Sequence, residues 1–161
     1  MTRVFPANGR FTPRQRELYT IYLKLYQALM TSINVHVSPR DVIRDAANKM
    51  EAIVRAYAFT DARIKAGAAA FVERYRNSSA NSLGHSVGME VHDVGRPAPT
   101  LEPGMVFTIE PALQIPDEHI GVRLEDMILI TDSGYENLSA FVPIEIDAIE
   151  ELMRQPGLQK R

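Results

Sequence analysis

The sequence predicts an α+β protein in which three helices precede a set of antiparallel strands. Up to about residue 76, apolar side chains recur every three or four positions, which is typical of helices that bury one face. Beyond residue 95 the pattern changes to short β-rich runs that are broken by proline and glycine. With 161 residues, the chain has the length of one domain with its own core.

Cap residues predict where the helices begin. Thr12 followed by Pro13 predicts a helix with Thr12 as its N-cap. Ser38 followed by Pro39 predicts the start of a second helix. A third helix is expected over residues 61–76, and an end helix over residues 144–153.

Aromatic residues recur at helical spacing in the first helix, at Tyr19, Tyr22 and Tyr26. We interpret them as core packing rather than as a binding stripe, because such a spacing aligns side chains on one buried face. His36, in the connection between the first two helices, is interpreted as structural or solvated.

Composition excludes several classes of function. The net charge of −2 gives no electrostatic reason to expect nucleic acid or an anionic membrane as a partner. There is no cysteine, so any metal must be held by histidine, aspartate and glutamate side chains. No apolar run approaches transmembrane length, and no signal peptide is recognisable at the start. A cytoplasmic location is therefore expected for a chain that begins at Met1.

Two histidines, His85 and His92, lie in the glycine-rich stretch 84–95. Imidazole is the commonest metal ligand and also the usual acid or base near neutral pH. The alternative is a pair of partly buried histidines that are hydrogen-bonded within a loop. Glu90 and Asp93 lie close by in the sequence, but their spacing does not favour them as ligands.

Two β-rich runs, over residues 105–110 and 121–131, each carry a carboxylate among apolar neighbours: Glu110 in the first and Glu125 in the second. A carboxylate inside a sheet is costly unless it is paired or bound to a metal. A salt bridge from Glu110 to Arg123 would explain the pattern as well as a metal would. A last short strand is expected over residues 137–142.

Three blocks carry a resemblance to a known family. They are Gly-His-Ser-Val-Gly at 84–88 with His-Asp-Val-Gly at 92–95, Glu-Pro-Gly-Met-Val-Phe-Thr-Ile-Glu-Pro at 102–111, and Gly-Val-Arg-Leu-Glu-Asp at 121–126. In this order they resemble the prolidase and Xaa-Pro aminopeptidase branch of the pita-bread (creatinase/aminopeptidase-like) metallopeptidases. The aspartate after His92 is more similar to that branch than to methionine aminopeptidase, where a glutamate usually follows.

The resemblance implies a pita-bread domain in which helices pack on a curved antiparallel sheet. It also implies hydrolysis at Xaa-Pro bonds by a metal-bridged hydroxide. Residues 1–161 would form a single C-terminal portion of the catalytic domain, truncated at its N-terminus. The implied partner is a peptide with proline at its second position, and a homo-oligomer is one option for assembly.

Family roles carry over onto matching positions. The implied metal ligands are His85, Glu110 and Glu125. In the complete domain the metal would be two manganese ions, with zinc or cobalt as alternatives, whereas this chain would hold one ion or none.

Further roles are implied for residues beside the ligands. His92 matches a histidine that contacts the substrate during catalysis, and Arg123 matches a catalytic arginine that precedes the last ligand. Arg96 is a candidate for binding the substrate.

The chain departs from the family pattern at two places. Thr2 and Arg3 match the end of an Asp-x-Thr-Arg motif, but the two aspartate ligands of the family have no counterpart here. A family histidine that serves in proton transfer is replaced by Asn81, which does not titrate. We therefore expect little or no peptidase activity from the chain as written. The alternative is a non-catalytic remnant or binding module that lacks a dinuclear metal centre.

Overall fold

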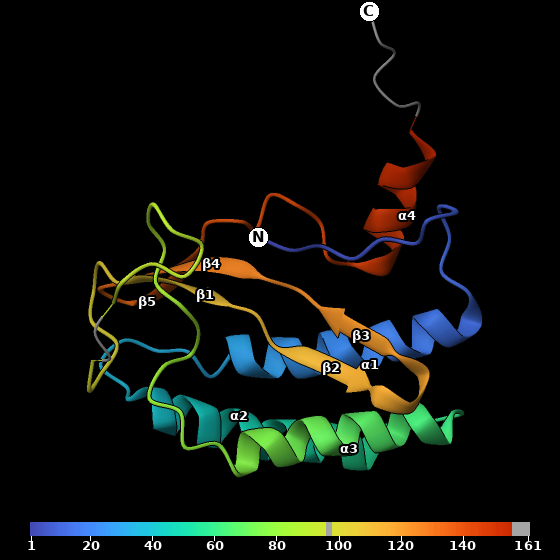
Figure 1. Ribbon diagram of the computed structural model, residues 1–161, viewed down its shortest axis with the longest axis horizontal. Coiled ribbons are helices and arrows are strands. Elements are labelled where there is room, and N and C mark those ends of the chain that lie inside the picture. The colour runs from blue at the N-terminus through green and yellow to red at the C-terminus, as the bar shows by residue number, and fades with distance from the viewer. Residues whose placement is uncertain (96–97, 156–161) are drawn as a thin grey trace, which may run out of the picture.

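The computed structural model describes residues 1–95 and 98–155, and its elements follow the predicted α+β order (Figure 1). The first half contains α1 (Pro13–Met30), α2 (Pro39–Ala56) and α3 (Ala62–Arg76). The second half contains β1 (Val106–Ile109), β2 (Ala112–Ile115), the 3-10 helix η1 (Pro116–Glu118), β3 (Ile120–Arg123), β4 (Asp126–Thr131), β5 (Gly134–Asn137) and α4 (Ile146–Arg154). None of the described helices combines the length and apolar character needed to cross a bilayer.

Helices α1 and α2 begin at their predicted caps, and α3 begins within its predicted range. The Thr12 hydroxyl accepts from the N–H of Gln15 at 3.3 Å, and the Gln15 side chain accepts from the N–H of Thr12 at 2.9 Å, so both halves of a capping box are present. The Ser38 hydroxyl accepts from the N–H of Asp41 at 3.1 Å. The Asp61 carboxylate caps α3 in the same way. These local bonds explain why the helix starts were predictable from the sequence.

Helix α1 is the centre of the core, because it packs against α2 and also reaches the strands. Figure 1 shows α1, α2 and α3 gathered on one side of the strands. Tyr19, Tyr22 and Tyr26 are each at most 1% exposed, which confirms their interpretation as core residues. Helix α3 comes close to β2 at Gly67, where an added Cβ would lie 3.1 Å from the carbonyl oxygen of Gln114.

Within the described residues, the strands form two antiparallel groups and not one continuous sheet. One group has the order β1-β4-β5, and the other is the β2-β3 hairpin. The run predicted over residues 121–131 is therefore divided between β3 and β4, and β2 was not predicted. The division occurs opposite Pro111, which has no N–H to donate to a neighbouring strand.

A tyrosine hydroxyl from α1 bridges the two strands at this break. Tyr22 donates to the carbonyl of Pro111 at 2.8 Å and accepts from the N–H of Leu124 at 2.6 Å. The register nevertheless continues across the break, since Ile109 pairs with Asp126 and Ala112 pairs with Arg123. The same register places Glu110 opposite Glu125.

The C-terminal part differs from prediction in one element. The prediction of a strand over residues 137–142 is wrong, because β5 ends at Asn137. The side-chain oxygen of Asn137 accepts from the N–H of Ser139 at 2.9 Å and turns the chain away from the ladder. The end helix expected over residues 144–153 is present as α4.

Candidate metal centre

His85 is held against β1 by two hydrogen bonds with Thr108. The N–H of Thr108 donates to the carbonyl of His85 at 3.0 Å, and the N–H of His85 donates to the Thr108 hydroxyl at 3.2 Å. Gly84 makes this approach possible, because a Cβ there would lie 1.7 Å from the carbonyl oxygen of Thr108. Thr108 is buried, and no sequence motif pointed to its role in holding His85.

The loop between the two histidines is shaped by Asp93. Its carboxylate accepts from the N–H of Met89 at 2.9 Å and from the N–H of Val94 at 2.7 Å. Gly88 lies against the same carboxylate, with an added Cβ only 1.4 Å from Oδ2. The Asp93 carboxylate therefore bonds to its own loop, in agreement with the expectation that it is not a metal ligand. Glu90 is exposed.

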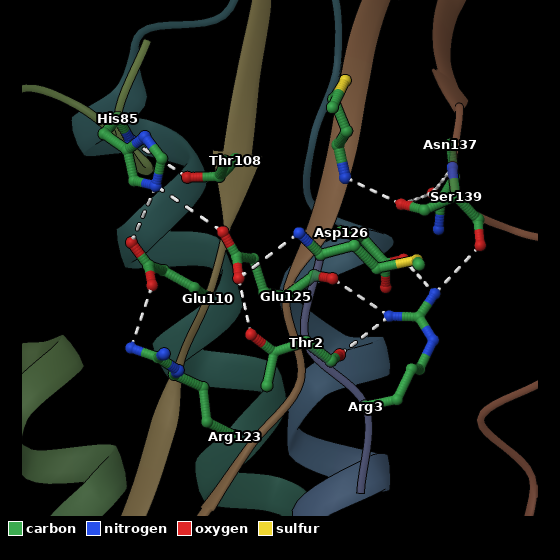
Figure 2. Close-up of polar contacts among 12 residues, drawn as sticks. Thr2, Arg3, His85, Thr108, Glu110, Arg123, Glu125, Asp126, Asn137 and Ser139 are labelled. Carbon is green, nitrogen blue, oxygen red and sulfur yellow. Dashed lines mark hydrogen bonds and ion pairs between the residues drawn. The ribbon is translucent and has the colours of Figure 1, made fainter. Parts of the chain in front are cut away.

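The side chains of His85, Glu110 and Glu125 converge (Figure 2). Nε2 of His85 lies 3.4 Å from Oε1 of Glu110 and 3.6 Å from Oε1 of Glu125. The three side chains are between 15% and 25% exposed, so solvent reaches them only partly. Residues separated by tens of positions in the sequence thus meet at one place.

The hydrogen bonding of His85 orients its second nitrogen toward the carboxylates. Nδ1 lies 2.9 Å from the carbonyl oxygen of Ser86. Because a carbonyl only accepts, Nδ1 carries the hydrogen, and in the neutral ring Nε2 presents a lone pair toward Glu110 and Glu125. Three electron-pair donors then face one another, namely this nitrogen and one oxygen of each carboxylate. The two carboxylates repel each other unless a cation lies between them. This donor set fits a divalent cation such as manganese, zinc or cobalt.

His92 borders the same place from the loop. Its ring centroid lies 4.6 Å from that of His85, with the rings nearly perpendicular. One ligand atom from each of His85, His92 and Glu110 lies within 4.8 Å of the others. His92 is exposed, whereas His85 is half-buried, so His92 faces the solvent side of the group.

Arg123 forms its ion pair with Glu110. Nη1 of Arg123 lies 3.1 Å from Oε2 of Glu110, and the arginine side chain is half exposed. The salt bridge considered from the sequence therefore exists beside the converging donors. The cross-strand register brings the charged end of Arg123 to Glu110, and its charge also contributes to lowering the pKa of Glu125.

Glu125 has partners near the N-terminus. The Thr2 hydroxyl donates to Oε2 of Glu125 at 2.6 Å, and the ammonium group of Met1 lies 3.5 Å from the same oxygen. The hydrogen bond from Thr2 lowers the pKa of Glu125 below its ordinary value, and the Met1 charge adds to this effect. Thr2 was noted in the sequence only as part of a motif, with no contact predicted.

One other predicted position, Asn81, lies apart from this contact network. Asn81 is exposed and accepts from Nε of Arg40 at 2.7 Å, which ties it to the start of α2. Arg96 lies outside the described residues.

The sequence matches metallopeptidase family M24 over residues 1–132. It is 35% identical to the Xaa-Pro aminopeptidase of Escherichia coli over 167 residues, which cover 95% of this chain and 37% of that protein. It is 37% identical to the Xaa-Pro aminopeptidase of Haemophilus influenzae, with 95% of this chain and 38% of that protein covered. The chain thus spans less than two fifths of the length of these relatives.

Solved structures agree with this match. Zinc-substituted aminopeptidase P of Escherichia coli in complex with product superposes with a TM-score of 0.68 at 34% identity, covering 94% of this chain and 37% of that one. A structure described as a putative aminopeptidase P from Bacillus anthracis gives 0.67 at 33% identity, covering 94% and 34%. These likenesses confirm the pita-bread fold and the resemblance predicted from the three sequence blocks. The chain therefore belongs to metallopeptidase family M24.

Proposed function

We propose that this chain supplies His85, Glu110 and Glu125 to a divalent-metal centre of a peptidase that acts at Xaa-Pro bonds. The observation that carries the proposal is the convergence of Nε2 of His85 with Oε1 of each glutamate, within 3.6 Å. The names of the relatives support the substrate class, a peptide with proline at its second position. Residues 1–161 would form one portion of the catalytic domain.

Each glutamate has one oxygen occupied and one directed toward His85. Arg123 pairs with Oε2 of Glu110, and Thr2 donates to Oε2 of Glu125. The Oε1 atom of each glutamate therefore faces the imidazole of His85. These two oxygens and Nε2 would hold the ion. When bound, a divalent cation there would supply Lewis acidity and lower the pKa of a bound water.

His92 and Arg123 have separate roles in this proposal. His92 is exposed beside His85, so its ring nitrogens are available to hydrogen-bond a peptide carbonyl that approaches the centre. Arg123 holds Oε2 of Glu110 through its ion pair and so orients the carboxylate. We propose Arg96 as a further substrate-binding residue on the basis of the family pattern alone.

A second candidate function is a non-catalytic module that keeps the pocket without metals. The observation in its favour is that Arg123 is a cationic neighbour of both glutamates, since it pairs with Glu110 and its charge lowers the pKa of Glu125. These contacts offset part of the repulsion between the two carboxylates. Metal binding distinguishes the two functions.

The first test titrates the chain with Mn²⁺ or Co²⁺. We expect one ion to bind, and we expect Glu110→Gln and Glu125→Gln each to weaken binding at least tenfold because each removes a charged donor. His92→Ala should leave the affinity close to that of the wild type. Glu136→Gln, which alters an exposed glutamate on β5, is the matched control. No uptake by the wild-type chain would favour the non-catalytic module.

The second test measures hydrolysis of an Xaa-Pro peptide with the same ions. We expect little or no turnover, because the two family aspartates have no counterpart in residues 1–161 and Asn81 replaces a titratable histidine. Loss of a general acid or base typically costs about 10²–10⁴-fold in rate. Robust turnover would show that the assigned ligand set is wrong.

A further inference from the structure

Arg3 is buried beside the candidate metal centre, with its side chain only 12% exposed. All five of its N–H donors have an acceptor. Nε donates to Val142 O at 3.2 Å, Nη1 to Thr2 O and Glu125 O at 3.0 Å each, and Nη2 to Asp126 Oδ1 at 2.6 Å and Ser139 O at 2.9 Å. The guanidinium therefore ties the N-terminal segment to β4 and to the turns after β5 (Figure 2).

Two of these acceptors belong to one backbone pair. The N–H of Thr2 donates to the carbonyl of Glu125 at 3.1 Å, and the N–H of Glu125 donates to the carbonyl of Thr2 at 3.1 Å. Nη1 of Arg3 donates to the same two carbonyls, so each carbonyl receives two hydrogen bonds. The arginine thus clamps both strands of an isolated antiparallel bridge.

This bridge controls the side chain of Glu125. The terminal torsion of a glutamate is broad, so its carboxylate rotates readily unless it is held. Thr2, fixed by the bridge, donates to Oε2 at 2.6 Å, while Oε1 lies 3.6 Å from Nε2 of His85. The Thr2 hydroxyl therefore decides which oxygen of Glu125 is available to an ion.

We propose that Arg3 is a positioning residue of the metal centre, acting through Thr2 to orient the carboxylate of Glu125. The inference rests on the proposed function, since it concerns a ligand of that centre. Arg3 does not contact the ion or the substrate in this role. Outer contacts of this kind orient metal ligands and are typically worth about 10–100-fold in metal affinity.

The opposite side of Arg3 is anchored in the core. Asp126 is fully buried and forms an ion pair with Nη2, which supplies the negative charge that a buried guanidinium needs. The hydroxyl of Tyr26 on α1 donates to the other oxygen of Asp126. The position of Glu125 is in this way connected to the central helix through Tyr26, Asp126, Arg3 and Thr2.

The test compares Co²⁺ binding by variants of the whole chain, followed by visible absorption of the bound cobalt. A purification tag belongs at the C-terminus, because the Met1 ammonium contacts Glu125. Thr2→Val removes the side-chain hydroxyl and keeps the shape of the side chain, whereas Thr2→Ser keeps the hydroxyl. Arg3→Lys removes the clamp. Arg14→Lys is the matched control, since it makes the same exchange in an arginine that bonds Asp61 and Glu118 instead.

We expect Thr2→Val and Arg3→Lys to weaken Co²⁺ binding about 10–100-fold and to change the cobalt spectrum. Thr2→Ser and Arg14→Lys should bind as the wild type does. Thermal unfolding of each variant identifies a temperature at which all are folded, and affinities are compared there. A merely structural role would lower the unfolding temperature and leave the affinity unchanged.

The outcomes separate this inference from the proposed function. If the wild-type chain takes up no Co²⁺, the metal centre fails and the inference fails with it. If the wild type binds and Thr2→Val and Arg3→Lys bind equally tightly, the positioning role is overturned while the centre stands. If Arg3→Lys does not fold, the Co²⁺ affinities of Thr2→Val and Thr2→Ser are compared instead, because both changes leave the guanidinium contacts in place. Equal affinities of these two variants would then overturn the inference.

Discussion

Gly84 lies where the chain entering His85 passes over β1 with no room for a side chain. An added Cβ would come within 1.7 Å of the carbonyl oxygen of Thr108, which is backbone and not a flexible side-chain end. Thr108 also bonds both backbone groups of His85, its carbonyl and its N–H. A change at Gly84 is therefore transmitted directly to the imidazole.

We expect Gly84→Ala to destabilise the fold by about 1–3 kcal/mol, the usual cost of forcing extra volume into a packed site. It should also weaken metal binding, because His85 moves with the displaced backbone. Urea unfolding and Co²⁺ titration measure the two effects. Gly121→Ala is the control, since an added Cβ there meets none of the described residues within 4 Å. Equal stability of the two variants would contradict the close contact.

At the scale of elements, the strand ladder is interrupted between the two strand groups, at the position of the two glutamates. Glu110 and Glu125 lie in the gap between the paired strands, and Tyr22 fills the neighbouring step of the ladder. Burial raises the pKa of Tyr22, so its hydroxyl keeps the proton that it donates to Pro111. Helix α1 thereby takes over part of the sheet's hydrogen bonding.

We expect Tyr22→Phe to lower the free energy of unfolding by about 1–3 kcal/mol, because it leaves a buried N–H and a buried carbonyl without the partner they share. Urea denaturation measures the loss. Tyr19→Phe is the comparison, because among the described residues that hydroxyl bonds only to the carbonyl of Ile144, at 2.8 Å, and its loss should cost less. A larger loss for Tyr19→Phe would argue against the bridging role.

At the scale of the whole molecule, charged groups attach the β2-β3 hairpin to the helices. On η1, Oε2 of Glu118 lies 2.7 Å from Nη2 of Arg14 on α1, and Oε1 lies 2.6 Å from Nη1 of Arg63 on α3. Arg14 also pairs with Asp61, the N-cap of α3, at 2.7 Å. The hydrogen bond from Arg14 lowers the pKa of Asp61 below its ordinary value.

This lowered pKa predicts a dependence of stability on pH. A carboxyl group whose pKa is lower in the folded state stabilises the fold above its unfolded pKa, about 3.9 for aspartate, and loses that contribution as the pH falls through the folded value. Asp61→Asn keeps an effective cap but loses the charge. We expect the variant to be less stable than the wild type at pH 5–7 and the difference to disappear in strong acid. Urea unfolding across this range checks it, and a difference that is constant with pH would exclude the ion pair as its cause.

The sequence by itself determined the helices, the family and the identity of the converging residues. Helix starts depend on caps such as Thr12 and Ser38, which bond within three residues of themselves. The blocks around His85, Glu110 and Glu125 are contiguous, so their resemblance was visible without coordinates. Their roles as ligands are still predictions.

Only the tertiary structure decided how these residues are held. Thr2 and Glu125 are 123 positions apart, as are Arg3 and Asp126, and Tyr22 and Leu124 are 102 apart. No local pattern predicts such bonds, because they depend on which backbone groups the packed helices and strands leave unpaired. The division of residues 121–131 into two strands and the pairing of Arg123 with Glu110 follow from the same cross-strand register, which is set by packing.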